Sequence, residues 1–101
     1  AAMSTREPFD VAVVGAGPVG AALALALARD GWRIALVEQR APEPVLAETP
    51  LDIRVSALAP RSRRLLEELG VWSACAARAQ AYTAMEVCDA HSPGRLRFDA
   101  A

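Results

Sequence analysis

A glycine-rich segment near the start of the chain has residue types and a spacing that favour anion binding. The hexapeptide GAGPVG, which begins at Gly15, follows the pattern GxGxxG. Gly15 permits a sharp turn, Gly17 lets the backbone approach a pyrophosphate, and Gly20 allows a helix to pack closely on a strand. Pro18 and Val19 would begin that helix, whose free N–H groups and partial positive charge attract an anion. The segment therefore predicts a pyrophosphate-binding turn; the alternative is a glycine-rich turn that binds nothing.

The segments on either side of this turn predict the strands and the helix that would position it. Residues 9–14 and 33–38 are short apolar runs without alternation, which is typical of parallel strands covered on both faces. Residues 18–30 are rich in alanine and leucine and therefore favour a helix, which Gly31 is suited to end. The fold class predicted is α/β, with a Rossmann-like βαβ unit.

An acidic residue stands where such a unit holds the ribose of a dinucleotide. Glu38 ends the second predicted strand, eighteen residues after Gly20. Its carboxylate can accept hydrogen bonds from both hydroxyls of an adenosine ribose, and it would repel a 2′-phosphate. The site is therefore expected to prefer FAD or NAD over NADP, and these residues leave the choice between FAD and NAD open.

The rest of the chain does not continue the β-α-β pattern that an NAD-dependent dehydrogenase would usually show. A proline-containing loop over residues 39–52 precedes a predicted helix from Pro60 to Gly70 and a helical segment over 71–79. Residues 82–90 and 95–98 predict a hairpin that turns at Ser92-Pro93-Gly94. Trp32 and Trp72 are expected to pack against other side chains.

Composition excludes several classes of protein. The net charge is −1, so the chain lacks the basic footprint of a nucleic-acid-binding protein. Residues 11–28 carry no charge, but glycine and proline interrupt them and Glu7 and Asp10 precede them, so we expect neither a membrane span nor a signal peptide. Cys75 and Cys88 lack metal-site spacing and are expected to be buried free thiols; we predict no metal site.

Four segments together resemble the N-terminus of flavoprotein aromatic hydroxylases, and more closely their ubiquinone-biosynthesis branch. They are DVAVVGAGPVGAALALALARDGWRIALVE at residues 10–38, DIRVSAL at 52–58, LGVW at 69–72, and the hairpin from MEVCDA at 85–90 to RFDA at 97–100. The resemblance extends over residues 9–101. It implies an FAD-dependent monooxygenase that uses NAD(P)H and oxygen to hydroxylate a phenolic ring, in this branch a polyprenylphenol.

The resemblance also implies which residues bind the cofactor. Arg54 corresponds to an arginine near the FAD phosphates; the alternative is a surface arginine paired with Asp52. Arg40 would lie on the adenosine side. No residue is assigned a catalytic role. The predicted cofactor-binding residues are Gly15, Gly17, Pro18, Val19, Gly20, Glu38, Arg40 and Arg54.

Members of this family are several times longer, and their later flavin-binding segments have no counterpart here. We therefore expect residues 1–8 to be a disordered start or a cloning remnant, 9–79 the N-terminal part of an FAD-binding domain, and 80–101 the first hairpin of a truncated substrate domain. Alone, the chain would be inactive. An NAD-dependent dehydrogenase or reductase module and a non-catalytic binding module remain as alternatives.

The resemblance implies partners and a location as well. The expected partner is a small aromatic substrate and not a nucleic acid. The whole protein would be cytoplasmic or would lie at the membrane surface, in contact with the membrane or with other proteins of ubiquinone biosynthesis.

Overall fold

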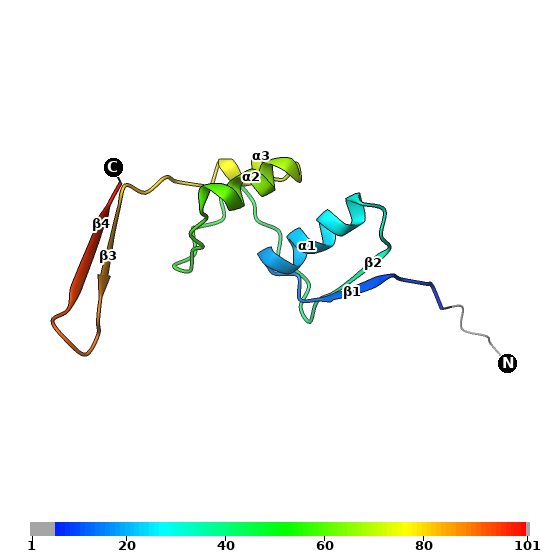
Figure 1. The fold of residues 1–101 in the computed structure, drawn as a ribbon, viewed down its shortest axis with the longest axis horizontal. Helices are drawn as coiled ribbons and strands as arrows, with labels where there is room; N and C mark the ends of the chain where they lie inside the picture. The colour runs from blue at the N-terminus through cyan, green and yellow to red at the C-terminus, as the bar shows by residue number, and fades with distance from the viewer. Residues whose placement is uncertain (1–5, 101) are drawn as a thin grey trace.

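The first half of the chain folds as the predicted strand–helix–strand unit. In the computed structural model, which describes residues 6–100, β1 (Val11–Val14) leads into α1 (Pro18–Arg29), and β2 (Ile34–Val37) follows. β1 and β2 pair in parallel, with Val11 opposite Ile34, and α1 packs against both strands (Figure 1). The predicted α/β class and βαβ unit are confirmed, and the first five residues of the predicted disordered start lie outside the described part.

The small residues of α1 determine how closely the helix approaches β1. A Cβ atom added to Gly20 would lie 1.9 Å from the carbonyl oxygen of Gly15 and 3.5 Å from Cγ1 of Val13. One turn further along the helix, Ala24 is 7 % exposed, and Val13 beneath it is 8 % exposed. Larger side chains at either helical position would lift α1 off the strand, so these residues fix the N-terminus of α1 beside the end of β1.

The second half of the chain forms two helices and a hairpin. α2 (Pro60–Glu68) and α3 (Trp72–Ala76) precede the antiparallel strands β3 (Ala84–Cys88) and β4 (Arg95–Asp99), and the turn between the strands includes the predicted Ser92-Pro93-Gly94. Arg63 joins the two helices: it pairs with Glu67 at 2.8 Å and lies over the ring of Trp72, 4.9 Å from its centroid.

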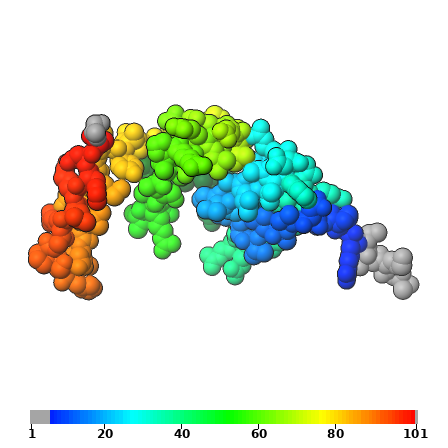
Figure 2. Space-filling view, viewed as in Figure 1, coloured from blue at the N-terminus to red at the C-terminus, as the bar shows by residue number. Residues whose placement is uncertain are grey.

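The described residues form an elongated body and not a compact globule. Its extents are 68 × 32 × 29 Å, and its radius of gyration of 19.0 Å compares with about 13 Å for a compact domain of this length. The accessible surface is 9400 Å², against roughly 5,500 Å² for a folded monomer of this mass. Figure 2 shows the hairpin at one end, well separated from the βαβ unit.

This shape corrects three expectations about burial. The strands are not covered on both faces, because α1 lies on one side of the sheet only, and Val14 remains 83 % exposed. Cys75 and Cys88 are free but exposed, since the described residues bring no second layer over α3 or the hairpin. Trp32 is 53 % exposed and does not pack as expected, whereas Trp72 is half-buried.

The close approach at Gly20 predicts an unequal response of two glycines to the same substitution. We expect Gly20→Ala to lower the free energy of unfolding by roughly 1–3 kcal/mol, because the new methyl group collides with the Gly15 carbonyl. Gly17→Ala is the matched control, since a Cβ there meets nothing within 4 Å, and it should lose less than about 1 kcal/mol. Chemical denaturation of the cofactor-free protein measures both; equal losses would contradict the packing described.

Candidate functional site

The N-terminus of α1 is open to an anion. Gly15 turns the chain out of β1 with a φ of +103° and donates its N–H to the Val37 carbonyl at 2.7 Å. Gly17 is the N-cap; no side chain caps the helix, and its first turn contains no acidic residue. The amides of Val19 and Gly20 lie in that first turn, where a helix offers them no acceptor. These N–H groups and the partial positive charge of the helix end favour an anion at this place.

The surroundings of Gly17 leave room for a group to reach the backbone. Nothing lies within 4 Å of the place where its Cβ would stand. Pro18 and Val19, the next two residues, are exposed and do not close over the turn. Open space in front of free amides is what a pyrophosphate needs, so the glycine-rich turn fits the diphosphate of a dinucleotide.

Glu38 links the end of β2 to this turn. Its Oε1 accepts the N–H of Ala16 at 2.9 Å, and its Oε2 accepts the N–H of Arg40 at 3.0 Å. The amide of Arg40, and next that of Ala16, lower the pKa of the Glu38 carboxyl below its ordinary value. The carboxylate is exposed, and each oxygen has a second lone pair, so it can still accept hydrogen bonds from the hydroxyls of a ribose.

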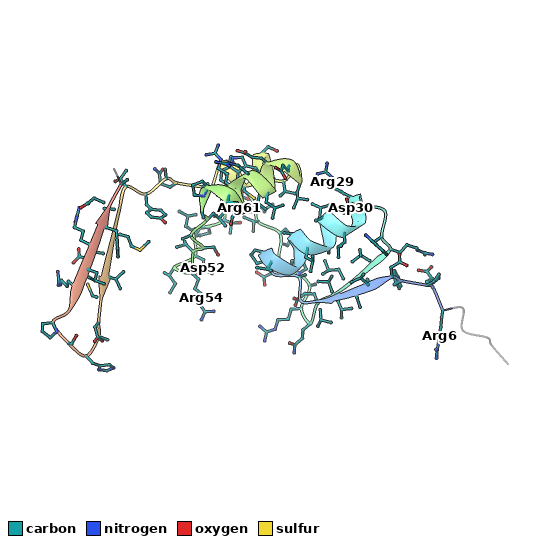
Figure 3. All side chains as sticks on the ribbon, in the orientation of Figure 1. Arg6, Arg29, Asp30, Asp52, Arg54 and Arg61 are labelled. Atoms are coloured by element: carbon teal, nitrogen blue, oxygen red, sulfur yellow. The ribbon has the colours of Figure 1, made fainter. Side chains whose placement is uncertain are left out.

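The structure gives less support to the two predicted arginines, Arg40 and Arg54, than to Glu38. Arg40 follows Glu38 in an exposed loop. Arg54 lies with Asp52 in the loop before α2, and in Figure 3 both stand apart from α1. The predicted alternative, an ion pair with Asp52, takes another form: the backbone N–H of Arg54, and not its guanidinium, donates to Asp52 Oδ1 at 3.0 Å. Within residues 6–100, no hydrogen bond or ion pair joins the Arg54 side chain to the glycine-rich turn.

One contact of the site was not anticipated from the sequence. The amide of Ala16 donates to Glu38 across 22 positions of the chain. Since any residue except proline provides a backbone N–H, no side-chain signal at Ala16 could have indicated this contact. It depends on the parallel pairing that brings the two strand ends together.

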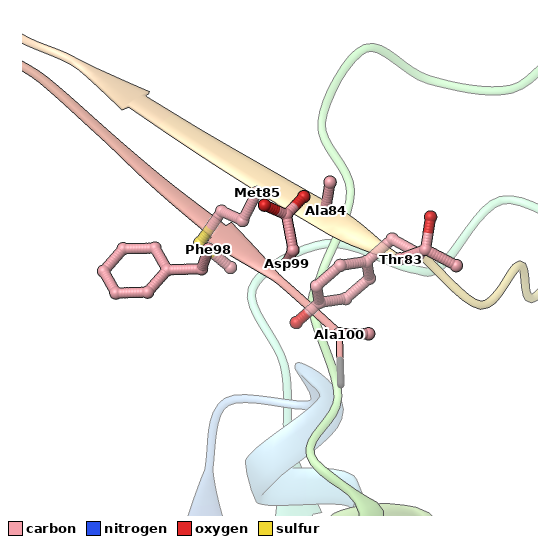
Figure 4. A pocket seen from close by; sticks show the side chains of 7 residues that line it. Thr83, Ala84, Met85, Phe98, Asp99 and Ala100 are labelled. Carbon is pink, nitrogen blue, oxygen red and sulfur yellow. The ribbon is translucent and has the colours of Figure 1, made fainter.

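The hairpin carries a largely apolar hollow that is remote from the glycine-rich turn (Figure 2). Met85 and Phe98 form a cross-strand pair on one face of the hairpin, and with Tyr82 they help to line a hollow of about 260 Å³ (Figure 4). The opposite face is charged, with Glu86 paired to Arg95 at 2.9 Å. The assignment of residues 80–101 to a substrate domain remains a prediction.

From residue 6 to residue 100, no three His, Cys, Asp or Glu side chains gather in a way that could hold a metal ion. Over the same residues, no helix combines the length and the apolar character that crossing a membrane requires.

The lowered pKa of Glu38 predicts a pH dependence of the glycine-rich turn. Because the folded pKa lies below that of an unfolded chain, the contact stabilises the fold above the ordinary glutamate pKa. This contribution is lost as the pH falls through the lowered value. In an NMR titration, the Ala16 amide proton should shift with a midpoint below that of glutamate in an unstructured peptide. Glu38→Gln should abolish the transition, and a midpoint at or above the peptide value would contradict the contact.

The comparisons with known proteins agree with this geometry. A family described as "FAD binding domain" matches residues 8–100. The chain is 40 % identical over 98 residues to 3-demethoxyubiquinol 3-hydroxylase of Escherichia coli, covering 96 % of this chain and 25 % of that protein. It is 37 % identical over 95 residues to ubiquinone hydroxylase UbiL of Rhodospirillum rubrum, covering 94 % and 22 %.

A third relative has a different substrate in its name. Kynurenine 3-monooxygenase of Stenotrophomonas maltophilia is 40 % identical over 78 residues, which cover 76 % of this chain and 17 % of that protein. The chain thus spans a quarter or less of the length of these relatives. No solved structure matches it at a significant level. The match over nearly all described residues identifies the chain as a member of the FAD-binding domain family.

Proposed function

We propose that this chain is the FAD-binding portion of a monooxygenase that hydroxylates a phenolic ring, specifically a polyprenylphenol in ubiquinone biosynthesis. The observation that carries the proposal is the open N-terminus of α1, held next to Glu38 by the Ala16 contact, in a chain that belongs to the FAD-binding domain family. The names of two relatives, a demethoxyubiquinol hydroxylase and a ubiquinone hydroxylase, support the ring and its substrate class.

The proposed roles follow from position and chemistry. The amides of Gly17, Val19 and Gly20 would bind the FAD pyrophosphate, and Gly15 and Pro18 would shape the turn that presents them. Glu38 would accept hydrogen bonds from the adenosine ribose, next to Arg40. Arg54 would contact the phosphates, since a guanidinium suits bidentate binding of their oxygens.

The chain's own contribution to such a reaction is binding and orientation. When bound, FAD would supply the redox chemistry that activates oxygen, with NAD(P)H as the proposed co-substrate. The glycine-rich turn and Glu38 would hold the adenosine end of the cofactor at a fixed place relative to the sheet. We assign no proton transfer to any residue between 6 and 100.

The proposed substrate suggests where the whole protein works. A polyprenyl tail of many CH₂ and CH₃ groups partitions into lipid. We therefore propose a cytoplasmic protein that acts at the membrane surface, alone or in contact with other proteins of the same biosynthesis.

Replacing Glu38 should weaken FAD binding more than it weakens the fold. Glu38→Ala removes the acceptors for the ribose and the link to Ala16, and the loss of charge-assisted hydrogen bonds predicts roughly a 10- to 100-fold higher Kd for FAD. Glu43→Ala, in the following exposed loop, is the matched control and should retain wild-type affinity. Flavin fluorescence titration measures the Kd, and an unchanged Kd in Glu38→Ala would refute the role of this carboxylate.

The reaction class can be tested with isotopically labelled oxygen. We expect the whole protein, loaded with FAD, to oxidise NAD(P)H faster when a polyprenylphenol is present and to place one atom from ¹⁸O₂ in the product, as mass spectrometry would show. Oxidation of the nucleotide without incorporation of oxygen would instead favour the dehydrogenase or reductase alternative.

A further inference from the structure

Arg78, two residues beyond the end of α3, holds a turn of the long loop between β2 and α2. Its guanidinium donates to the carbonyl oxygens of Thr49 at 2.9 Å, Leu46 at 3.4 Å and Pro50 at 3.5 Å. These acceptors lie 28 to 32 positions earlier in the chain. The contact therefore joins the loop to the helical part of the molecule.

The turn that Arg78 holds is itself ordered by two hydrogen bonds. The N–H of Thr49 donates to the Leu46 carbonyl at 3.0 Å, and the N–H of Leu46 donates to Thr49 Oγ1 at 2.9 Å. Thr49 is the least exposed residue between 38 and 60, and large apolar side chains there, such as Leu46 at 56 % and Ile53 at 98 % exposure, are open to solvent. Because apolar packing is sparse along this loop, the hydrogen bonds to Arg78 restrain a segment that has few other long-range contacts of this kind.

The hydrogen bonds of Arg78 also limit where Arg54 can lie, because few residues separate Arg54 from the turn that Arg78 holds. Pro50, whose carbonyl Arg78 binds, is four residues from Arg54, a span of at most about 14 Å when fully extended. Asp52 shortens it further, since its Oδ1 accepts the Arg54 N–H at 3.0 Å. Among residues 6–100, Arg78 provides the only long-range hydrogen bonds to the loop between Glu38 and Ala59.

We propose that Arg78 is a positioning residue that places Arg54 for contact with the phosphates of FAD; this rests on the role of Arg54 in the proposed function. The side chain at position 78 must reach three carbonyls at once. Arginine has five donors in a planar group, whereas lysine has a single ammonium, so lysine should replace it only in part.

The first experiment examines the loop without cofactor. In the whole protein without FAD, Arg78→Gln should speed hydrogen exchange at the Leu46 and Thr49 amides several-fold and leave exchange in α1 unchanged. Arg64→Gln is the matched control: Arg64 is exposed on α2, and its guanidinium takes part in none of the hydrogen bonds found among residues 6–100. Unchanged exchange in Arg78→Gln would overturn the proposal.

The second experiment measures the Kd for FAD in Arg78→Gln, Arg78→Lys, Arg54→Gln and the double variant. We expect Arg78→Gln to raise the Kd roughly fivefold or more, with Arg78→Lys between it and the wild type. In the Arg54→Gln background, losing Arg78 should change little, because Arg78 acts through Arg54. Thermal unfolding of each cofactor-free variant shows whether the fold is retained, and Arg78→Lys provides the test if Arg78→Gln does not fold.

The possible results distinguish failure of the Arg78 inference from failure of the proposed cofactor site. Additive effects in the double variant, or a wild-type Kd in both Arg78 variants, would overturn the inference while the proposed cofactor site stands. A wild-type Kd in Arg54→Gln, with the Glu38→Ala effect intact, would remove the role of Arg54 and the inference with it. A wild-type Kd in Glu38→Ala as well would instead count against the proposed site itself.

Discussion

The contact between the backbone of Gly20 and the carbonyl of Gly15 is the constraint on which the rest of the βαβ unit depends. There is no room for a Cβ between them, so α1 lies directly against the end of β1, and the two buried side chains among residues 6–100, Val13 and Ala24, belong to this strand and this helix. The same approach leaves the first amides of α1 facing outward. Close packing on one side of the turn thus leaves the other side open, where the proposed pyrophosphate site lies.

Arginine side chains connect the βαβ unit to α2, and they connect the later elements to one another, where apolar packing is sparse. Arg29 of α1 donates to the Glu68 carbonyl at the end of α2, Arg63 joins α2 to α3, and Arg78 joins α3 to the loop. All the basic residues of the chain are arginine, and the planar guanidinium suits such multiple contacts. Exposed contacts of this kind are individually weak, which accords with the elongated shape.

The elements themselves were largely predictable, because their signals are local. Apolar runs, Pro18 and Gly31 indicated β1, α1 and β2, and the turn residues Ser92-Pro93-Gly94 between two predicted strands indicated the hairpin. Burial was predicted less well. The exposure of Trp32 and of both cysteines depends on which layers cover a residue, and neither periodicity nor residue type specifies those layers.

The α/β unit, the glycine-rich turn and the place of Glu38 follow from the order of residues alone, because glycine spacing and short apolar runs act over a few residues. The hydrogen bond from the Ala16 amide to the Glu38 carboxylate and the contacts of Arg78 with the 46–50 turn became visible only in three dimensions. The groups at Ala16 and in the 46–50 turn are a backbone N–H and backbone carbonyls, which nearly all residue types provide. Their partners are therefore chosen by the path of the chain in space, which brings distant segments together, and not by the side chains at those positions.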